Sequence, residues 1–351
     1  MKLAKLFAAL CLVLALYSCD KSSKDDITPP VGPGTYVLNN GNWGSNDANI
    51  GVYYPSTKTY VTDAFYSANG QKLGDLGQDI IATGESIYIA VNGSKTIFVT
   101  DKNLKIKQQI NAEKDGARLS PRYFATSGSK VYITYYEGYV GEISEDASVR
   151  LCSVGPNPDG LAVAGENLYV ANSGGMLYPA YNNTVSVVSL STFEEVSTIE
   201  VNVNPAKVEA SSDGTYIYVS SFGDYEAIPV KLQVIEASTG EVTDLEYSSV
   251  SAIAKGQGDI LYILCGGYDN NWNPLPGTVY KHDMKSNTPL GIFVTDGTVL
   301  PDAYSISVDK DGYVYVGCSD YKNTGDVYVF TRSGALHDKF DSQGMNPLKA
   351  Y

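Results

Sequence analysis

Seven short apolar runs, each containing a tyrosine, recur along the chain at nearly regular intervals. Successive tyrosines are 52, 44, 37, 49, 44 and 53 residues apart. They are Tyr36, Tyr88, Tyr132, Tyr169, Tyr218, Tyr262 and Tyr315. A repeat of about 40 to 50 residues made of short strands is typical of a β-propeller, in which each repeat forms one blade. The spacing therefore predicts an all-β chain of seven blades. Alternation along each strand predicts that the tyrosines pack between blades.

Each repeat also contains the other strands that a blade requires. A turn with proline precedes the tyrosine run, as in Asn157-Pro158-Asp159-Gly160, and a short apolar strand follows that turn. Two further strand patterns come after the run, most clearly at 184–190 and 195–199. Four antiparallel strands joined by hairpins make one blade. We name them A to D, with strand A innermost after the proline turn and strand B formed by the tyrosine run.

The two ends of the repeat region each carry part of one blade. The first repeat begins at its tyrosine run, and no proline turn stands directly before Tyr36. The last residues, Asn346 to Tyr351, form a proline turn and a strand with no tyrosine run after them. We therefore predict that the C-terminal strand joins the N-terminal strands in a shared closing blade. Such closure removes the free sheet edges of an open array.

The segment before the repeats is typical of an exported lipoprotein. Residues 1–18 combine two lysines with an apolar stretch too short to span a membrane, which predicts a signal peptide. Cys19 follows a small residue, as in the bacterial lipobox, so we expect lipidation there. Residues 19–34 are polar and rich in Pro and Gly, which predicts a flexible tether. The propeller itself is then expected to span residues 35–351.

Composition argues against nucleic-acid binding and against a disulfide framework. The chain has 39 acidic against 25 basic residues and 28 tyrosines. A net charge of −14 repels phosphate backbones, so nucleic-acid binding is not expected. Cys152, Cys265 and Cys318 remain after the export segment, and the last two occupy equivalent positions in neighbouring repeats. Equivalent positions in adjacent blades are too far apart for a disulfide, so we expect small buried thiols.

The loops between strands B and C are rich in aromatic residues and asparagine. In a propeller these loops emerge together with the D to A connections around one end of the central channel. Flat amphipathic rings beside amides suit a large polar ligand, and loops on a rigid scaffold often carry binding residues. The alternative is that the aromatics plug the channel or brace their own loops. The predicted ligand-binding residues are Asn40, Asn42, Trp43, Tyr135, Tyr136, Tyr139, Tyr178, Tyr181, Phe222, Tyr225, Tyr268, Asn270, Trp272 and Tyr321.

Catalytic patterns are weaker than this aromatic pattern. The two histidines, His282 and His337, lie in outer-strand contexts away from the aromatic loops, and no nucleophile elbow, zinc motif or phosphate loop occurs. Residues 269–273 match only the first half of a calcium loop, so no metal site is predicted. An enzyme of the propeller lactonase type would need clustered acids at the channel mouth. The candidates are Glu137, Asp224, Glu226, Asp269 and Asp320.

The repeats resemble those of YncE-like (YVTN) seven-bladed propellers. The resemblance rests on Leu168-Tyr169-Val170-Ala171-Asn172, Asn157-Pro158-Asp159-Gly160 and the strand that begins at Asn183-Thr184. The opening at 36–46, directly after the tether, is similar to surface lipoproteins of Bacteroidota that include the BtuG-like cobalamin-binding propellers. The resemblance to this propeller family covers the region from Tyr36 to Tyr351 at the level of fold.

This resemblance implies a corrinoid-binding protein with no catalytic step. Such a protein captures vitamin B12 as a transported ligand, needs no resident cofactor and passes the corrinoid to a TonB-dependent outer-membrane transporter, on which it sits as a lid. It would be lipid-anchored at the outer membrane on the cell surface. A glycan-binding or adhesive surface propeller remains open, because Trp and Tyr also stack on sugars, and a lactonase-type enzyme is the third reading.

Overall fold

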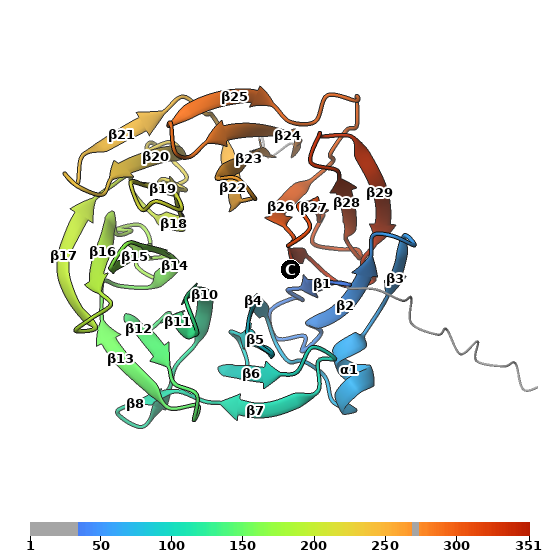
Figure 1. The fold of residues 1–351 in the computed structure, drawn as a ribbon, viewed down its shortest axis with the longest axis horizontal. Coiled ribbons are helices and arrows are strands. Elements are labelled where there is room, and N and C mark those ends of the chain that lie inside the picture. The colour runs from blue at the N-terminus through green and yellow to red at the C-terminus, as the bar shows by residue number, and fades with distance from the viewer. Residues whose placement is uncertain (1–33, 269–273) are drawn as a thin grey trace, which may run out of the picture.

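Seven four-stranded antiparallel sheets form a ring in the computed structural model, which describes residues 34–268 and 274–351 (Figure 1). Blade 1 closes the ring and consists of β30 (Pro347–Ala350), β1 (Thr35–Asn39), β2 (Asn49–Tyr54) and β3 (Thr59–Val61). Strands A to D of blade 2 are β4 (Gly77–Thr83), β5 (Ser86–Val91), β6 (Thr96–Thr100) and β7 (Ile106–Ile110). The prediction of a seven-bladed propeller is confirmed.

The remaining blades repeat the same strand order. Blade 3 consists of β10 (Pro121–Ser127), β11 (Lys130–Tyr135), β12 (Tyr139–Ile143) and β13 (Val149–Ser153). Blade 4 consists of β14 (Pro158–Ala164), β15 (Asn167–Asn172), β16 (Thr184–Ser189) and β17 (Glu194–Glu200). Blade 5 consists of β18 (Pro205–Ala210), β19 (Tyr216–Ser221), β20 (Lys231–Glu236) and β21 (Val242–Leu245).

The last two blades complete the ring. Blade 6 consists of β22 (Val250–Lys255), β23 (Ile260–Tyr268), β24 (Pro274–Asp283) and β25 (Thr288–Ile292). Blade 7 consists of β26 (Ala303–Val308), β27 (Val314–Cys318), β28 (Asp326–Phe330) and β29 (Leu336–Asp341). Two insertions outside the blades were not predicted from sequence: α1 (Ala64–Asn69), and a small hairpin of β8 (Glu113–Lys114) and β9 (Ala117–Arg118).

The closing blade joins the two ends of the propeller as predicted. β30 pairs antiparallel with β1, with Val37 opposite Ala350 and Leu38 opposite Lys349. The backbone groups of Tyr36 and Tyr351 exchange two hydrogen bonds of 2.8 Å. The ring therefore closes through backbone pairing between residues more than 300 positions apart.

The core lies between adjacent blades. The strand B tyrosines Tyr132, Tyr169, Tyr218, Tyr262 and Tyr315 are buried there, whereas Tyr36 and Tyr88 are half-buried. The hydroxyl of Tyr218 donates to the carbonyl of Met284 at 3.1 Å, and that of Tyr315 donates to Asp309 at 2.8 Å. Cys152, Cys265 and Cys318 are buried free thiols, as predicted. The strand B tyrosines are therefore scaffold residues.

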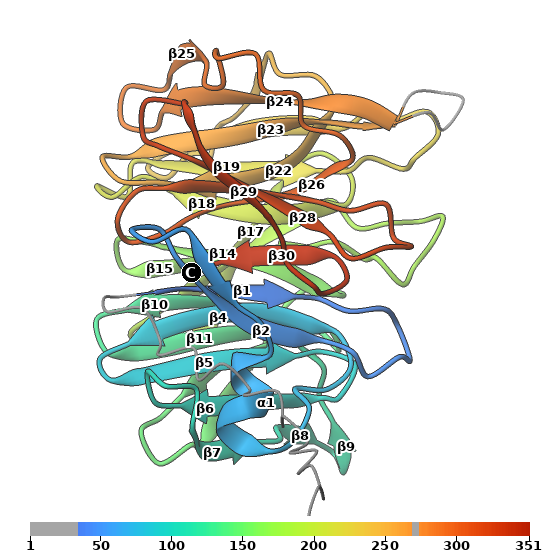
Figure 2. The ribbon, with the colours of Figure 1, turned by 90° about the vertical axis from the view of Figure 1, so that its right-hand side faces the viewer.

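Blade 6 differs from prediction on the loop side. Tyr268 is predicted in a loop between strands B and C, but β23 and β24 continue their pairing through Gly267–Leu275 and Tyr268–Pro274 after a bulge beyond Cys265. Glycine accommodates the irregular backbone that a bulge requires. The two strands therefore form an arm that projects from the loop side of the disc (Figure 2).

Candidate binding face

The B to C loops and D to A connections share one side of the disc, here called the loop face. Four predicted residues present exposed rings there: Trp43, Tyr178, Tyr225 and Tyr321 are 80%, 64%, 63% and 52% exposed. They belong to the loops of blades 1, 4, 5 and 7. Exposed large rings at the ends of a rigid scaffold are the arrangement expected of a binding surface.

An aromatic cluster spans the loops of blades 4 and 5. Tyr181 makes edge contacts with Tyr178 and with Tyr225, each with ring centroids 5.9 Å apart. Phe222 stacks on Tyr225 at 6.5 Å. We call these four residues the aromatic cluster. Its rings lie at several angles to one another, so the cluster offers both faces and edges to a ligand.

Hydrogen bonds fix the loops that carry this cluster. The Asp224 carboxylate accepts the backbone N–H groups of Glu226 and Ile228 at 2.9 and 2.7 Å, and these bonds hold the pKa of Asp224 below its usual value. In blade 4, Asn157 Oδ1 accepts the backbone N–H of Met176 at 3.0 Å. Rings held in place before binding lose little conformational freedom when a ligand arrives. The loops are therefore preorganised.

Tyr136 connects the aromatic cluster to the channel mouth. Its hydroxyl lies against Gly175 of the blade 4 loop, and its ring lies under the guanidinium of Arg122 at 4.8 Å. Arg122 donates to Asp159 Oδ1 at 2.8 Å and to Gln78 Oε1 at 2.9 Å. These contacts join strands A of blades 2, 3 and 4 around the mouth.

A shared irregularity of the inner strands places these polar groups. Within blades 2 to 7, pairing between strands A and B shifts register just after the start of strand A, as at Pro121/Phe124 and Pro205/Lys207. A bulge redirects the side chains next to it. The affected residues, which sequence reasoning missed, include Gln78, Arg122, Asp159, Lys207 and Tyr304. The polar side chains of Arg122 and Asp159 directly after a proline were a usable signal.

The far side of the mouth belongs to blade 7. Tyr304 makes an edge contact with Tyr321 at 5.6 Å and lines the same central cavity as Tyr123, Lys207 and Phe222. That cavity has a volume of about 380 Å³. The channel mouth is therefore open to the aromatic loops on both sides.

Other predicted residues have different positions. Asn40 and Asn42 are half-buried and brace the closing blade, the first by donating to the carbonyl of Gly77 and the second by accepting from Asn346. Tyr135 is 1% exposed in the core between blades 2 and 3, and Tyr139 packs partly against that core. Tyr135 and Tyr136 are consecutive in an extended chain, so only one can face the mouth. The structure does not describe the side chain of Tyr268 or the residues Cys19, Asn270 and Trp272.

The described acids considered for catalysis accept hydrogen bonds within or between the loops. Glu137 accepts from the backbone N–H and hydroxyl of Ser120, and Glu226 accepts from Tyr178 at 3.5 Å. Asp320 accepts the N–H groups of Lys322 and Asn323, which lower its pKa to about 2. Asp269 lies outside the described residues. Among residues 34–268 and 274–351, no group of three His, Cys, Asp or Glu side chains is placed to hold a metal ion.

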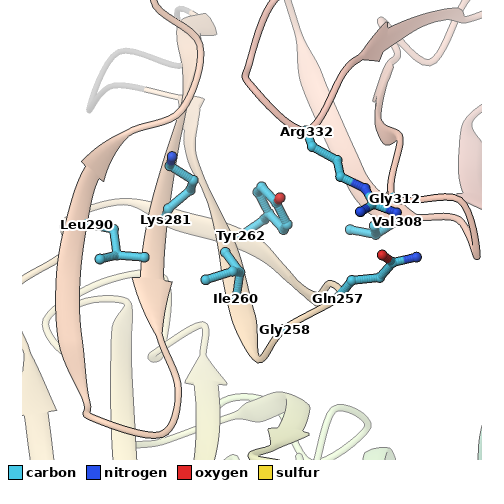
Figure 3. Close-up of a pocket in the computed structure, with 9 residues that line it drawn as sticks. All are labelled: Gln257, Gly258, Ile260, Tyr262, Lys281, Leu290, Val308, Gly312 and Arg332. Atoms are coloured by element: carbon cyan, nitrogen blue, oxygen red, sulfur yellow. The ribbon is translucent and has the colours of Figure 1, made fainter.

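A separate cleft lies between blades 6 and 7 (Figure 3). It has a volume of about 350 Å³, and Lys281 and Arg332 lie on either side of Tyr262. The A to B turn of blade 6 contributes Gln257 and Gly258, so this cleft belongs to the side opposite the loop face. It is thus separate from the aromatic cluster.

Within the described chain, no helix combines the length and the apolar character that crossing a bilayer requires.

Comparison with known proteins identifies the fold alone. No protein-family model and no curated sequence matches the chain. Two candidate 6-phosphogluconolactonases, from Bacteroides fragilis and Bacteroides uniformis, are similar in structure, each with a TM-score of 0.61 over 91% of this chain. Their identities are 13% and 14%, and 98% and 99% of their own chains are covered. Hydrazine synthase from Kuenenia stuttgartiensis matches with a TM-score of 0.56 at 19% identity, over 71% of this chain and 74% of its own. These are likenesses between propellers.

Proposed function

We propose that the protein binds a corrinoid on its loop face and takes no catalytic part. The observation that carries the proposal is the aromatic cluster of Tyr178, Tyr181, Phe222 and Tyr225 beside a polar channel mouth. A corrin is a large, rigid ring system edged with amides. Aromatic faces would pack against its ring surface, while amide, guanidinium and hydroxyl groups at the mouth would satisfy its polar edge.

We further propose that the propeller is lipid-anchored through Cys19 at the cell surface and passes the corrinoid to a TonB-dependent transporter. The export segment and the Pro-rich tether support this placement. The anchor is tested by replacing Cys19 with Ala and fractionating cells. We expect the variant to leave the membrane fraction and the unchanged protein to remain there. Equal membrane retention of both would exclude anchoring at this cysteine.

The binding proposal is tested with cobalamin, whose red chromophore reports binding directly. Purified protein mixed with cobalamin should retain the colour through gel filtration, and titration calorimetry should give a saturable 1:1 isotherm. Replacing both Tyr181 and Tyr225 with Ala should weaken binding at least about tenfold, because each ring contact contributes about 0.5–1.5 kcal/mol and 1.4 kcal/mol corresponds to tenfold.

A matched control keeps this result specific to the loop face. Tyr66 on α1 is 53% exposed and lies outside the B to C loops, so Tyr66→Ala should leave the affinity unchanged. A colourless protein peak would exclude the corrinoid. Saturable binding on a glycan array, weakened by the same double substitution, would then favour the glycan-binding reading instead.

A further inference from the structure

Charged side chains gather on the inner strands, although most of a propeller core is apolar. The seven inner strands carry four cations, Arg122, Lys207, Lys255 and Lys349, and three carboxylates, Asp79, Asp159 and Glu209. Five of these seven line the central cavity, and Arg122 donates a hydrogen bond to Gln78, which also lines it. The inner strands therefore carry one more positive than negative charge in a protein whose net charge is −14.

Three of the four cations have a carboxylate partner. Lys349 Nζ lies 2.6 Å from Asp79, Arg122 lies 2.8 Å from Asp159, and Lys255 lies 3.0 Å from Asp259. Asp79 also accepts the backbone N–H groups of Ile80 and Phe124, so its oxygens are already engaged. These pairs leave the ammonium of Lys207 to be accounted for.

Lys207 is half-buried in the cavity and has no oxygen partner among the described residues. Its ammonium instead makes a cation–π contact with the Tyr123 ring, whose centroid lies 3.3 Å from Nζ. A cation–π contact stabilises an ammonium less than a hydrogen-bonded carboxylate does. Burial accordingly lowers the pKa of Lys207 to about 8, against the opposing attraction of Asp159 and Asp79.

The ring beneath Lys207 is held by a hydrogen-bond chain across three blades. Asp159 accepts from Arg122, Arg122 donates to Gln78 Oε1, and Gln78 Nε2 donates to the Tyr123 hydroxyl at 2.7 Å. These hydrogen bonds fix the Tyr123 ring, which supports the Lys207 ammonium. The same cavity includes Phe222 of the aromatic cluster, so Lys207 can be reached from the loop face.

We propose that the channel mouth is a binding site for a small anionic group, a phosphate or a carboxylate, held by the ammonium of Lys207. The group would supply the oxygen partner that this cation lacks, and the Tyr123 ring would form the floor beneath it. The anion could be free in solution, or it could be part of a larger ligand whose body rests on the aromatic cluster. In the second case the inference deepens the proposed function and rests on it.

Free-anion binding is measured by calorimetry with sulfate, which keeps its charge between pH 6 and 10, and with inorganic phosphate. We expect saturable sulfate binding at pH 6.5 that weakens at least about tenfold by pH 9.5, because the anion needs the protonated amine and Lys207 loses its proton near pH 8. The groups that face Lys207 are Asp79, Arg122, Asp159, Glu209 and Lys349.

Variants separate this site from general charge effects. Lys207→Met should abolish saturable binding, and Lys207→Arg should retain it at neutral pH and at pH 9.5. Lys281→Met, in the cleft of Figure 3, should bind sulfate as the unchanged protein does. Lys207→Met should melt at the same or a higher temperature, since it removes a buried charge. Absence of saturable binding to the unchanged protein, or equal binding by Lys207→Met, would overturn the proposal.

A corrinoid pair identifies the source of the anion. Cobalamin carries a phosphodiester that cobinamide lacks. If that group occupies the site, Lys207→Met should weaken cobalamin binding and leave cobinamide binding unchanged. If Lys207→Met binds cobalamin as tightly as the unchanged protein does but no longer binds sulfate, the site belongs to a free anion. Failure of all corrinoid binding would overturn the proposed function while leaving the sulfate result to decide this inference.

Discussion

At the scale of single residues, His282 shows how a buried polar group is satisfied inside a blade interface. Its Nε2 lies 2.9 Å from Asn287 Oδ1, and its Nδ1 lies 3.1 Å from the Tyr247 hydroxyl. The amide oxygen can only accept, so Nε2 carries the proton and Nδ1 accepts from Tyr247. Burial lowers the pKa of His282, and the bond to Asn287 opposes that shift. The folded protein therefore favours the neutral ring.

This shift predicts a pH dependence of stability. A histidine whose pKa is lower in the folded protein stabilises the fold fully at pH values above its unfolded pKa of about 6.5. This stabilisation is lost as pH falls below that value. Urea unfolding should thus give a lower free energy at pH 5.5 than at pH 7. In His282→Asn the free energy should be lower at pH 7 but should change less between the two pH values. An equal change in both proteins would contradict this assignment.

The pH window keeps the titration of His282 apart from that of Asp259. Asp259 is hydrogen-bonded to Ser212 and paired with Lys255, and despite its burial its pKa lies below the usual range. Its contribution is therefore present above the unfolded value of about 4 and is lost at lower pH. Measurements between pH 5.5 and 7 avoid that loss.

At the scale of strands and loops, the repeat pattern predicts the fold well because each blade reuses the same local code. A proline turn, an apolar strand and a tyrosine run recur, and the structure places β14 and β15 where that code indicates. Strand ends are less well determined. Tyr135 was predicted on the binding face, but β11 continues through it and its side chain is buried in the core. A loop residue and the last strand residue look alike when both are tyrosine.

The inner strands were the least predictable part of the candidate site. Arg122 and Asp159 each directly follow a proline, and Lys207 follows by two positions. Their meeting around one axis depends on ring closure and on bulges that recur from blade to blade. Neither the closure geometry nor the bulge is visible in a single repeat. The aromatic loops were found because their composition is unusual, whereas these charges needed the assembled ring.

At the scale of the whole molecule, the ring depends on a strand of four residues at the C-terminus. β30 supplies the inner strand of blade 1, and Asn346 just before it donates to the carbonyl of Gly41 and accepts from Ser319. Lys349 pairs with Asp79 of blade 2, so β30 connects blade 1 to blades 2 and 7. Without it, β1 would become a free edge.

Deleting residues 345–351 should therefore destabilise the entire ring. The deletion removes the β30 pairing and leaves the Asp79 carboxylate, 2% exposed, without its cation. Breaking a buried ion pair alone costs about 3–5 kcal/mol, so we expect the melting temperature to fall by roughly 10 °C or more. Lys349→Met keeps the strand and removes only the pair, so calorimetry should place its melting temperature between those of the deletion and the unchanged protein. The free edge of β1 should also promote association, seen as larger species in light scattering. A deletion that melts with the unchanged protein would show that the ring is held without its C-terminal strand.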